Sequence, residues 1–206
     1  MEAALDSFVN KQDWKNAASA AGNLSELHLV LGDLVRAEAR AHEAVEHADR
    51  SQNNFQQLSK RTALADALHQ CSDLAAARAL FEDAESSQRT LQPSYPFLYS
   101  VRGHLYCDLL LELNDAVAVV RRSTQALAVA STHGWLLDIA LEHLNLGRAH
   151  LALDELGPAR EYFDRAVEAS ALLEHSTTCR AASSPAPPSA ARPAISSWRA
   201  GISPRR

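Results

Sequence analysis

The chain has 206 residues, of which 47% are hydrophobic and 22% charged, and its formal net charge is −5, a composition typical of soluble globular proteins. No run of purely apolar residues exceeds five, and the N-terminus lacks a basic region followed by an apolar one, so the sequence predicts neither a membrane span nor a secretory signal. The three cysteines are odd in number and far apart, which argues against a disulfide framework and favours a reducing, cytoplasmic compartment.

Apolar residues recur at helical spacing through most of the chain, and no alternating strand pattern interrupts them. Turn signals separate the helical stretches at Gly32-Asp33, Ser72-Asp73, Asn114-Asp115 and 154–158. An aromatic residue opens each helix pair: Trp14, Phe55, Tyr95 with Phe97, and Trp135. The sequence therefore predicts an all-α fold, with helices over 13–31, 34–51, 55–71, 74–90, 95–113, 116–132, 135–153 and 156–174.

These helix pairs repeat one another with a period of 40 to 42 residues. Each first helix carries a large residue followed by a small one, at Leu24-Ser25, Leu64-Ala65, Tyr106-Cys107 and Leu146-Gly147. Twelve residues after the small position, the second helix carries Ala37, Ala77, Val119 or Ala159. Small side chains at these positions let the two helices approach closely. Since one pair cannot bury its apolar face alone, residues 13–174 are predicted to form a single domain of about four stacked pairs.

The pattern resembles the tetratricopeptide repeat family. It differs from the family in a period longer than the usual ~34 residues and in lacking the proline that often closes a unit. The resemblance implies a right-handed α-solenoid of antiparallel helix pairs that binds a protein or peptide in its groove. Repeats of this longer kind look like those of bacterial regulatory and signal-transduction proteins, which are often attached to nucleotide-binding or effector domains.

Two end segments depart from the repeat. Residues 1–12 match the end of a second helix whose first helix is missing, because Ala4 stands 40 residues before Ala44. We expect this helix to be frayed and to leave Leu5, Phe8 and Val9 poorly covered. Residues 175–206 are rich in Ala, Ser, Pro and Arg and cannot bury enough apolar surface to offset the entropy of ordering, so they are predicted to be disordered.

A second interpretation starts from the tail. Arginine outnumbers lysine 17 to 3, which suggests a GC-rich gene, and a shifted reading frame from about residue 169 can restore an apolar helical pattern where a fifth repeat is due. The chain would then be a truncated or frame-disrupted regulatory region of a larger multidomain bacterial signalling protein of the NTPase type. This interpretation predicts an exposed apolar face on the helix near 156–170 and self-association through exposed repeat ends.

Motifs for chemistry are missing from the sequence. It contains no phosphate-binding loop, no dinucleotide fingerprint, no nucleophile elbow and no His-Glu-x-x-His. The nine histidines do not show the spacing typical of zinc ligands. We therefore expect a non-catalytic protein without a metal or cofactor. Scattered arginines in the tail do not indicate a nucleic-acid partner.

The first helix of each pair should line the concave face of such a stack. The residue after each small position is expected to point there, namely Glu26, Asp66, Asp108 and Arg148, with His69, His104 and Glu112 nearby. A mostly acidic groove favours a basic peptide through charge-assisted hydrogen bonds; the alternative is a solvated face without a ligand. All three lysines, Lys11, Lys15 and Lys60, lie elsewhere in the pattern, which argues against capture of a peptide's C-terminal carboxylate.

The link at 91–99 has an unusual composition. Pro93 and Pro96 bracket Tyr95, with Phe97 and Tyr99 close behind. Residues before proline avoid the helical region, so this link is predicted to be stiff and extended. Its aromatic side chains either fill a wide joint between repeats or form a ledge on which a peptide docks.

Overall fold

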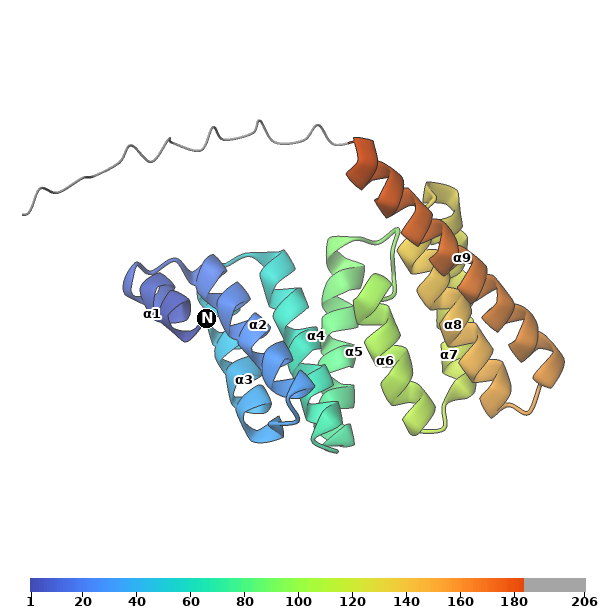
Figure 1. The fold of residues 1–206 in the computed structure, drawn as a ribbon. Coiled ribbons are helices and arrows are strands. Elements are labelled where there is room, and N and C mark those ends of the chain that lie inside the picture. The colour runs from blue at the N-terminus through green and yellow to red at the C-terminus, as the bar shows by residue number, and fades with distance from the viewer. Residues whose placement is uncertain (184–206) are drawn as a thin grey trace, which may run out of the picture.

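The computed structural model describes residues 1–183, and these form an all-helical structure without strands, which confirms the predicted all-α class. Figure 1 shows the helices side by side in chain order. They are α1 (Glu2–Asn10), α2 (Trp14–Val30), α3 (Leu34–Ser51), α4 (Asn54–Gln70), α5 (Leu74–Leu91), α6 (Ser100–Glu112), α7 (Ala116–His133), α8 (Leu136–Ala152) and α9 (Leu156–Ser183). Each first helix also packs against the next first helix, α2 on α4, α4 on α6 and α6 on α8.

One kind of turn recurs within the helix pairs, at the predicted places. A residue with positive φ follows the first helix, at Gly32, Ser72, Asn114 and Asp154. At the first three of these turns the next residue is an aspartate that caps the second helix. The side chains of Asp33, Asp73 and Asp115 each accept a hydrogen bond from the backbone N–H three residues further on, which satisfies a donor that the helix itself leaves unpaired.

Small residues bring the two helices of a pair together. Ser25, Ala65, Cys107 and Gly147 are all buried. Ser25 Oγ donates to the carbonyl oxygen of Ala37 at 2.8 Å, across the first pair. In the last pair, a Cβ added to Gly147 would lie only 2.7 Å from the ring of Phe163. Because Gly147 has no side chain, the ring of Phe163 can pack directly against α8.

The predicted start of α6 is wrong. The helix begins at Ser100 instead of residue 95, and residues 92–99 form a loop. Pro93 and Pro96 account for the difference, because proline lacks the N–H that a helix interior needs and restricts the residue before it. The sequence therefore placed a link here correctly, and the helix assignment that overlapped it was wrong.

The expectation that α1 leaves Leu5 poorly covered is also wrong. In α1, Leu5 is only 2% exposed and packs in an apolar cluster with Ala17, Ala21, Leu24 and Ala44, with Phe8 and Val9 partly buried against it. An ion pair of 2.9 Å between Arg40 and Glu2 fastens α1 to α3. Leu5 is covered because α2, together with Ala44 of α3, offers it an apolar surface.

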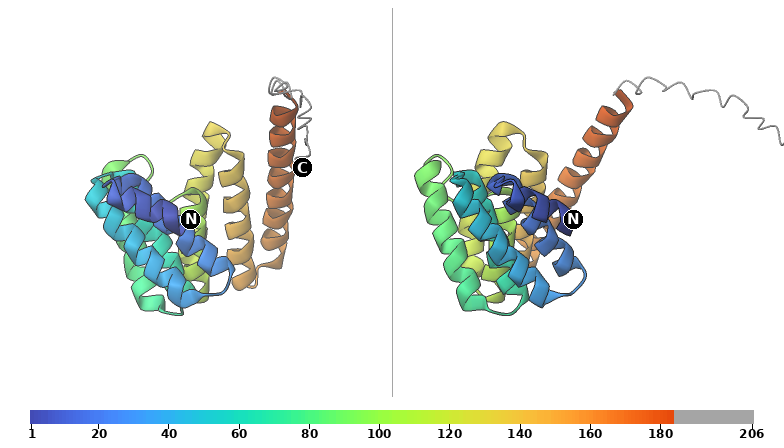
Figure 2. Two further views of the ribbon diagram at one scale, coloured as in Figure 1. Left: turned by 60° about the vertical axis from the view of Figure 1, so that its left-hand side comes forward. Right: turned by 90° about the vertical axis from the view of Figure 1, so that its left-hand side faces the viewer.

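The last helix extends further than the sequence pattern indicated. We expected it to end at residue 174, but α9 continues to Ser183, and Figure 2 shows its C-terminal part projecting beyond the other helices. The rest of the predicted disordered tail, 184–206, lies outside the described residues. Leu156, Val167 and Leu172 on α9 are exposed.

A single added methyl group tests the close approach in the last pair. Gly147→Ala should lower the free energy of unfolding by about 1–3 kcal/mol, because the ring of Phe163 must move, although alanine is ordinarily the better helix former. Ser86→Ala on α5 is the control, because Ser86 is an exposed residue in the interior of a helix; it should leave stability unchanged or raise it by about 0.5 kcal/mol. Urea denaturation measures both, and equal effects of the two variants would contradict this packing.

Candidate functional site

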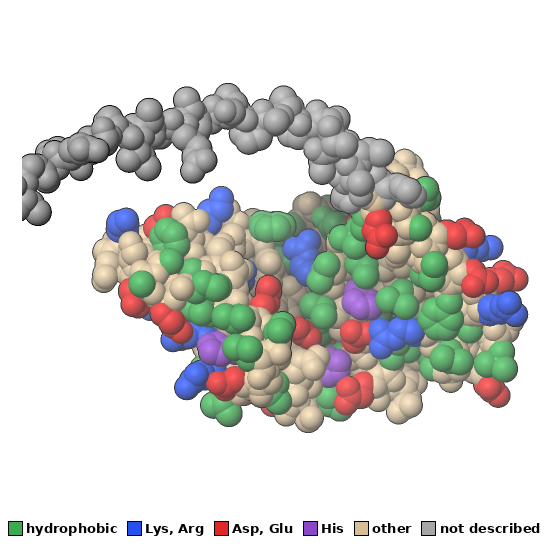
Figure 3. All heavy atoms as spheres, viewed as in Figure 1, with side chains coloured by type: hydrophobic (Ala, Val, Ile, Leu, Met, Phe, Trp, Pro, Cys, Tyr) green, Lys and Arg blue, Asp and Glu red, His purple; other side chains and the backbone are tan. Residues whose placement is uncertain are grey.

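The predicted charged residues of α4, α6 and α8 meet on one face of the stack, where acidic, histidine and arginine side chains gather (Figure 3). Arg148 donates from Nη1 to Asp108 Oδ1. His104 Nε2 lies 3.8 Å from the other oxygen of Asp108, and His69 Nε2 lies 2.7 Å from Glu112 Oε2. Four of the seven predicted residues are thus paired across neighbouring repeats, and His104 pairs with Asp108 within α6. These pairs make the face less acidic than the sequence alone indicates.

Asp66 and Glu26 remain without an ion pair among the described residues. Burial raises the pKa of Asp66 above its ordinary value, and the charges of Asp108 and Glu26 raise it further, against the opposing effects of a hydrogen bond from Gln70 and the charge of His69. Asp66 therefore carries a negative charge that its surroundings disfavour. A cationic ligand placed beside it would relieve this penalty.

Lys60 lies closer to this face than the sequence pattern indicated. Its side chain is nearly buried and covers Gly22 of α2, where an added Cβ would lie 2.6 Å from Nζ. Burial lowers the pKa of Lys60, while the charge of Glu26 opposes that shift. Lys60 thus compensates part of the charge of Glu26 but does not reach Asp66 with an ion pair.

The aromatic link 92–99 is held by a buried ion pair. Arg122 of α7 donates from Nη1 to Glu85 Oε2 of α5 at 2.8 Å, and its Nη2 lies 2.6 Å from Oε1. The backbone N–H of Leu98 donates to the same Glu85 carboxylate at 3.0 Å. The Arg122 guanidinium also lies over the rings of Phe97 and Tyr106, at 4.9 and 4.3 Å from their centroids. One buried cation thereby fixes the position of the link.

Two other aromatic residues of the link, Tyr95 and Tyr99, form a cluster with residues of the turn before α8. Tyr95 and Tyr99 stack on Trp135, with ring centroids 6.1 and 6.2 Å away. His133 stacks on Trp135 at 4.6 Å. Trp135 is nevertheless 37% exposed, so the cluster forms the rim of a surface opening. Phe97 fills a joint between repeats, while Trp135 and the tyrosines reach solvent.

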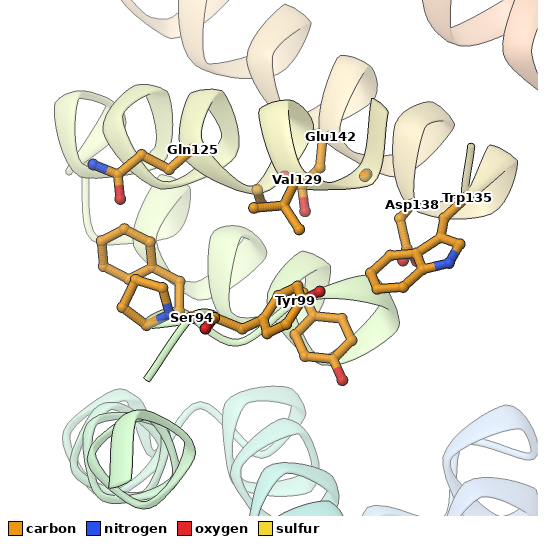
Figure 4. A pocket seen from close by; sticks show the side chains of 12 residues that line it. Ser94, Tyr99, Gln125, Val129, Trp135, Asp138 and Glu142 are labelled. Atoms are coloured by element: carbon orange, nitrogen blue, oxygen red, sulfur yellow. The ribbon is translucent and has the colours of Figure 1, made fainter. Parts of the chain in front are cut away.

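A pocket of about 210 Å³ lies behind this rim, between the link, α7 and α8. Its walls are mostly apolar and include Phe97, Ala126 and Val129. Two carboxylates also line it: Figure 4 shows Asp138 beside the ring of Trp135, with Glu142 further along α8. Asp138 is 9% exposed and Glu142 2% exposed. The structure therefore adds an acidic, aromatic pocket that the sequence-predicted site residues do not include.

Glu142 is the more strongly perturbed of the two acids. Burial raises the pKa of its carboxyl to about 7, although hydrogen bonds with Ser123 and Asn145 and the charge of Arg122 act in the opposite direction. Asn145 Nδ2 donates to Glu142 at 3.2 Å, and the amide oxygen of Asn145 lies 2.7 Å from His104 Nδ1. Through His104 and Asp108, a chain of polar contacts joins the pocket to the first-helix face.

Two residues that the sequence analysis missed, Glu85 and Glu142, stand out when equivalent positions of the four repeats are compared. Glu85 occupies the position that Val45, Leu127 and Val167 hold in the other repeats, so a single acid replaces an aliphatic residue there. Glu142 corresponds to Ala20, Lys60 and Arg102, a position that packs toward the preceding first helix. Asp138 carries no such signal, because Asn16 and Gln56 at equivalent positions are also polar.

Comparison with protein-family models and with curated proteins finds no match to this chain. Over the described part of the chain, no group of three or more His, Cys, Asp or Glu side chains is arranged to hold a metal ion. None of the described helices combines the length and apolar character needed to cross a membrane.

The raised pKa of Glu142 predicts a pH-dependent stability. Its ionised form is disfavoured in the fold, so the cost is absent below the ordinary pKa near 4.5, grows as the pH rises, and is complete above about 7. Glu142→Gln should therefore be more stable than the natural protein at pH 8, by up to about 3 kcal/mol, and nearly equal to it at pH 4. Thermal unfolding at the two pH values measures this difference. The exposed Glu168→Gln serves as control, and the same gain at both pH values would contradict the assignment.

Proposed function

We propose that this chain is a non-catalytic, cytoplasmic interaction module that binds a protein or peptide partner on a right-handed α-solenoid of tetratricopeptide-repeat type. Three features support the solenoid: the recurring helix pairs, the repeated capped turn, and the contacts between successive first helices. Stacked pairs of this kind present an extended face to which several repeats contribute side chains, and such faces suit the binding of extended partners.

The observation that carries the proposal is the uncompensated charge at Asp66. It lies half-buried on α4, its pKa is raised first by burial and then by Asp108 and Glu26, and the nearby arginine, Arg148, is already paired with Asp108. A lysine or arginine side chain of a partner would supply the missing positive charge through a charge-assisted hydrogen bond. The proposed partner is therefore a basic segment of a protein.

A peptide-binding measurement tests this proposal. A fluorescent peptide of alternating glycine and arginine should bind weakly and salt-sensitively, and a glycine–glutamate peptide should not bind. Asp66→Asn should weaken binding about three- to tenfold, since one charged contact is lost. Affinity should also fall as the pH is lowered toward the raised pKa of Asp66. Fluorescence anisotropy measures each effect.

The matched control is Asp164→Asn on α9, an exposed aspartate that lies 4.0 Å from Arg160 in a loose surface pair. This variant should bind the arginine peptide as the natural protein does. Equal binding of the two peptides, or an equal loss in both variants, would overturn the proposal that the first-helix face recognises a basic segment.

A second candidate function, a regulatory region that docks onto another helical unit or a second copy, is favoured by the surface of α9. Val167 is 70% exposed, and it borders an apolar groove between α8 and α9 that is lined by Leu137, Leu141 and Leu144. Exposed apolar surface of this kind promotes association in water. The larger signalling protein of the sequence-based alternative would offer such a docking unit.

Sedimentation equilibrium tests this second candidate. The natural chain should show an average mass that rises with concentration, and Val167→Glu should reduce that rise because it places a charge on the apolar surface. Val117→Glu on α7, where valine is similarly exposed, is the control and should leave the association unchanged. A monomer at every concentration would rule out the self-association form of this candidate.

A further inference from the structure

The pocket behind Trp135 combines two unlike surfaces. Toward Gln125 its walls are apolar, with Phe97, Ala126 and Val129. Toward the opening lie the carboxylate of Asp138 and the ring of Trp135, side by side in Figure 4. A ligand that satisfies both surfaces must have an apolar stem and a polar head, with the head near Asp138.

The charge of the head follows from Asp138. Its side chain is more than nine-tenths buried and lines the pocket. Within the described range, no hydrogen bond or ion pair reaches its carboxylate. Arg102 of α6 interacts with it electrostatically, but the guanidinium of Arg102 lies against Phe55 and Tyr99. A buried carboxylate without a bonded partner is costly, and a cation in the pocket would remove that cost.

Glu142 and the aromatic rings also favour a cationic head. Glu142 is a second acid on the pocket wall, partly ionised at neutral pH because burial raises its pKa to about 7. Trp135 and Tyr99 offer aromatic faces and edges near Asp138, and aromatic faces attract ammonium and guanidinium groups. A neutral or anionic head would leave the Asp138 carboxylate without a bonded partner.

We infer that this pocket binds an organic cation, an ammonium group on an apolar stem, with the ammonium between Asp138 and the Trp135 rim and the stem along Val129 and Phe97. Two sources share this chemistry: a free alkylamine and the lysine side chain of a partner. The site lies on α7, α8 and the 92–99 link, so it is separate from the Asp66 region of the first-helix face.

Two matched probe pairs test this inference. The first pair is n-pentylammonium and 1-pentanol, which share a stem and differ in the charge of the head. The second pair is the N-acetyl amide of lysine and that of norleucine, which represents a partner's side chain. Titrations followed by the NMR signal of the Trp135 indole N–H should show saturable shifts with pentylammonium, the lysine amide or both. The neutral member of each pair should bind at least about tenfold more weakly.

The decisive variant is Asp138→Asn, which keeps the size of the side chain and removes its charge. It should weaken binding of the cationic probe about tenfold and leave the weak binding of 1-pentanol unchanged. Glu142→Gln provides a second variant with the same expected direction. Asp164→Asn is the control and should bind like the natural protein. Circular dichroism establishes that each variant is folded.

Either of two results would overturn the inference. In the first, neutral and cationic probes bind equally well, which identifies a purely apolar pocket. In the second, no probe gives a saturable shift in a folded protein. Asp66→Asn separates this inference from the proposed function, because it should impair binding of the arginine peptide and leave pentylammonium binding intact. A failure of peptide binding alone therefore leaves the cation site standing.

Discussion

The buried ion pair between Glu85 and Arg122 determines the arrangement of the middle of the molecule. It joins α5 to α7 directly, and the same carboxylate accepts the backbone N–H of Leu98. Removing one partner of a buried pair leaves the other charge uncompensated, at a cost of about 3–5 kcal/mol. Three kinds of contact hold the Arg122 guanidinium in the core. They are the charge of Glu85, the hydrogen bond that Arg122 donates to Glu85, and the rings of Phe97 and Tyr106 that lie against the guanidinium.

This anchor accounts for the pocket between the 92–99 link, α7 and α8. In the last pair, Gly147 brings α8 and α9 so close that Phe163 fills the space. In the third pair, Cys107 and Ser123 are opposed at 3.8 Å, and the 92–99 link is held by Glu85 at one side of α7. The link supplies aromatic side chains but no helix, so the space between it and α8 is only partly filled. The two acids of α8 then line the remaining cavity.

The buried acids Asp138 and Glu142 do not stabilise the folded state. Burial raises the pKa of Glu142 to about 7, which means that the folded state disfavours its charge at neutral pH. Residues that reduce stability without serving packing are expected at binding sites. A chain of polar contacts through Asn145 and His104 leads from Glu142 to Asp108 on the first-helix face. Polar contacts therefore join the pocket to that face.

The sequence by itself determined the all-α class, the turns within the pairs and most helix positions, but not the start of α6 or the end of α9. Small residues at a 40-residue spacing and capping aspartates are local signals, because they act within one pair or one turn. Only the tertiary structure decided three other features. These are the burial of Leu5, the ion pairs that neutralise Asp108 and Glu112, and the pocket with Asp138 and Glu142. Each of these depends on side chains about 40 residues apart that meet across neighbouring pairs. A repeat pattern fixes which position faces a neighbour, but the charge balance there depends on the particular side chains that meet.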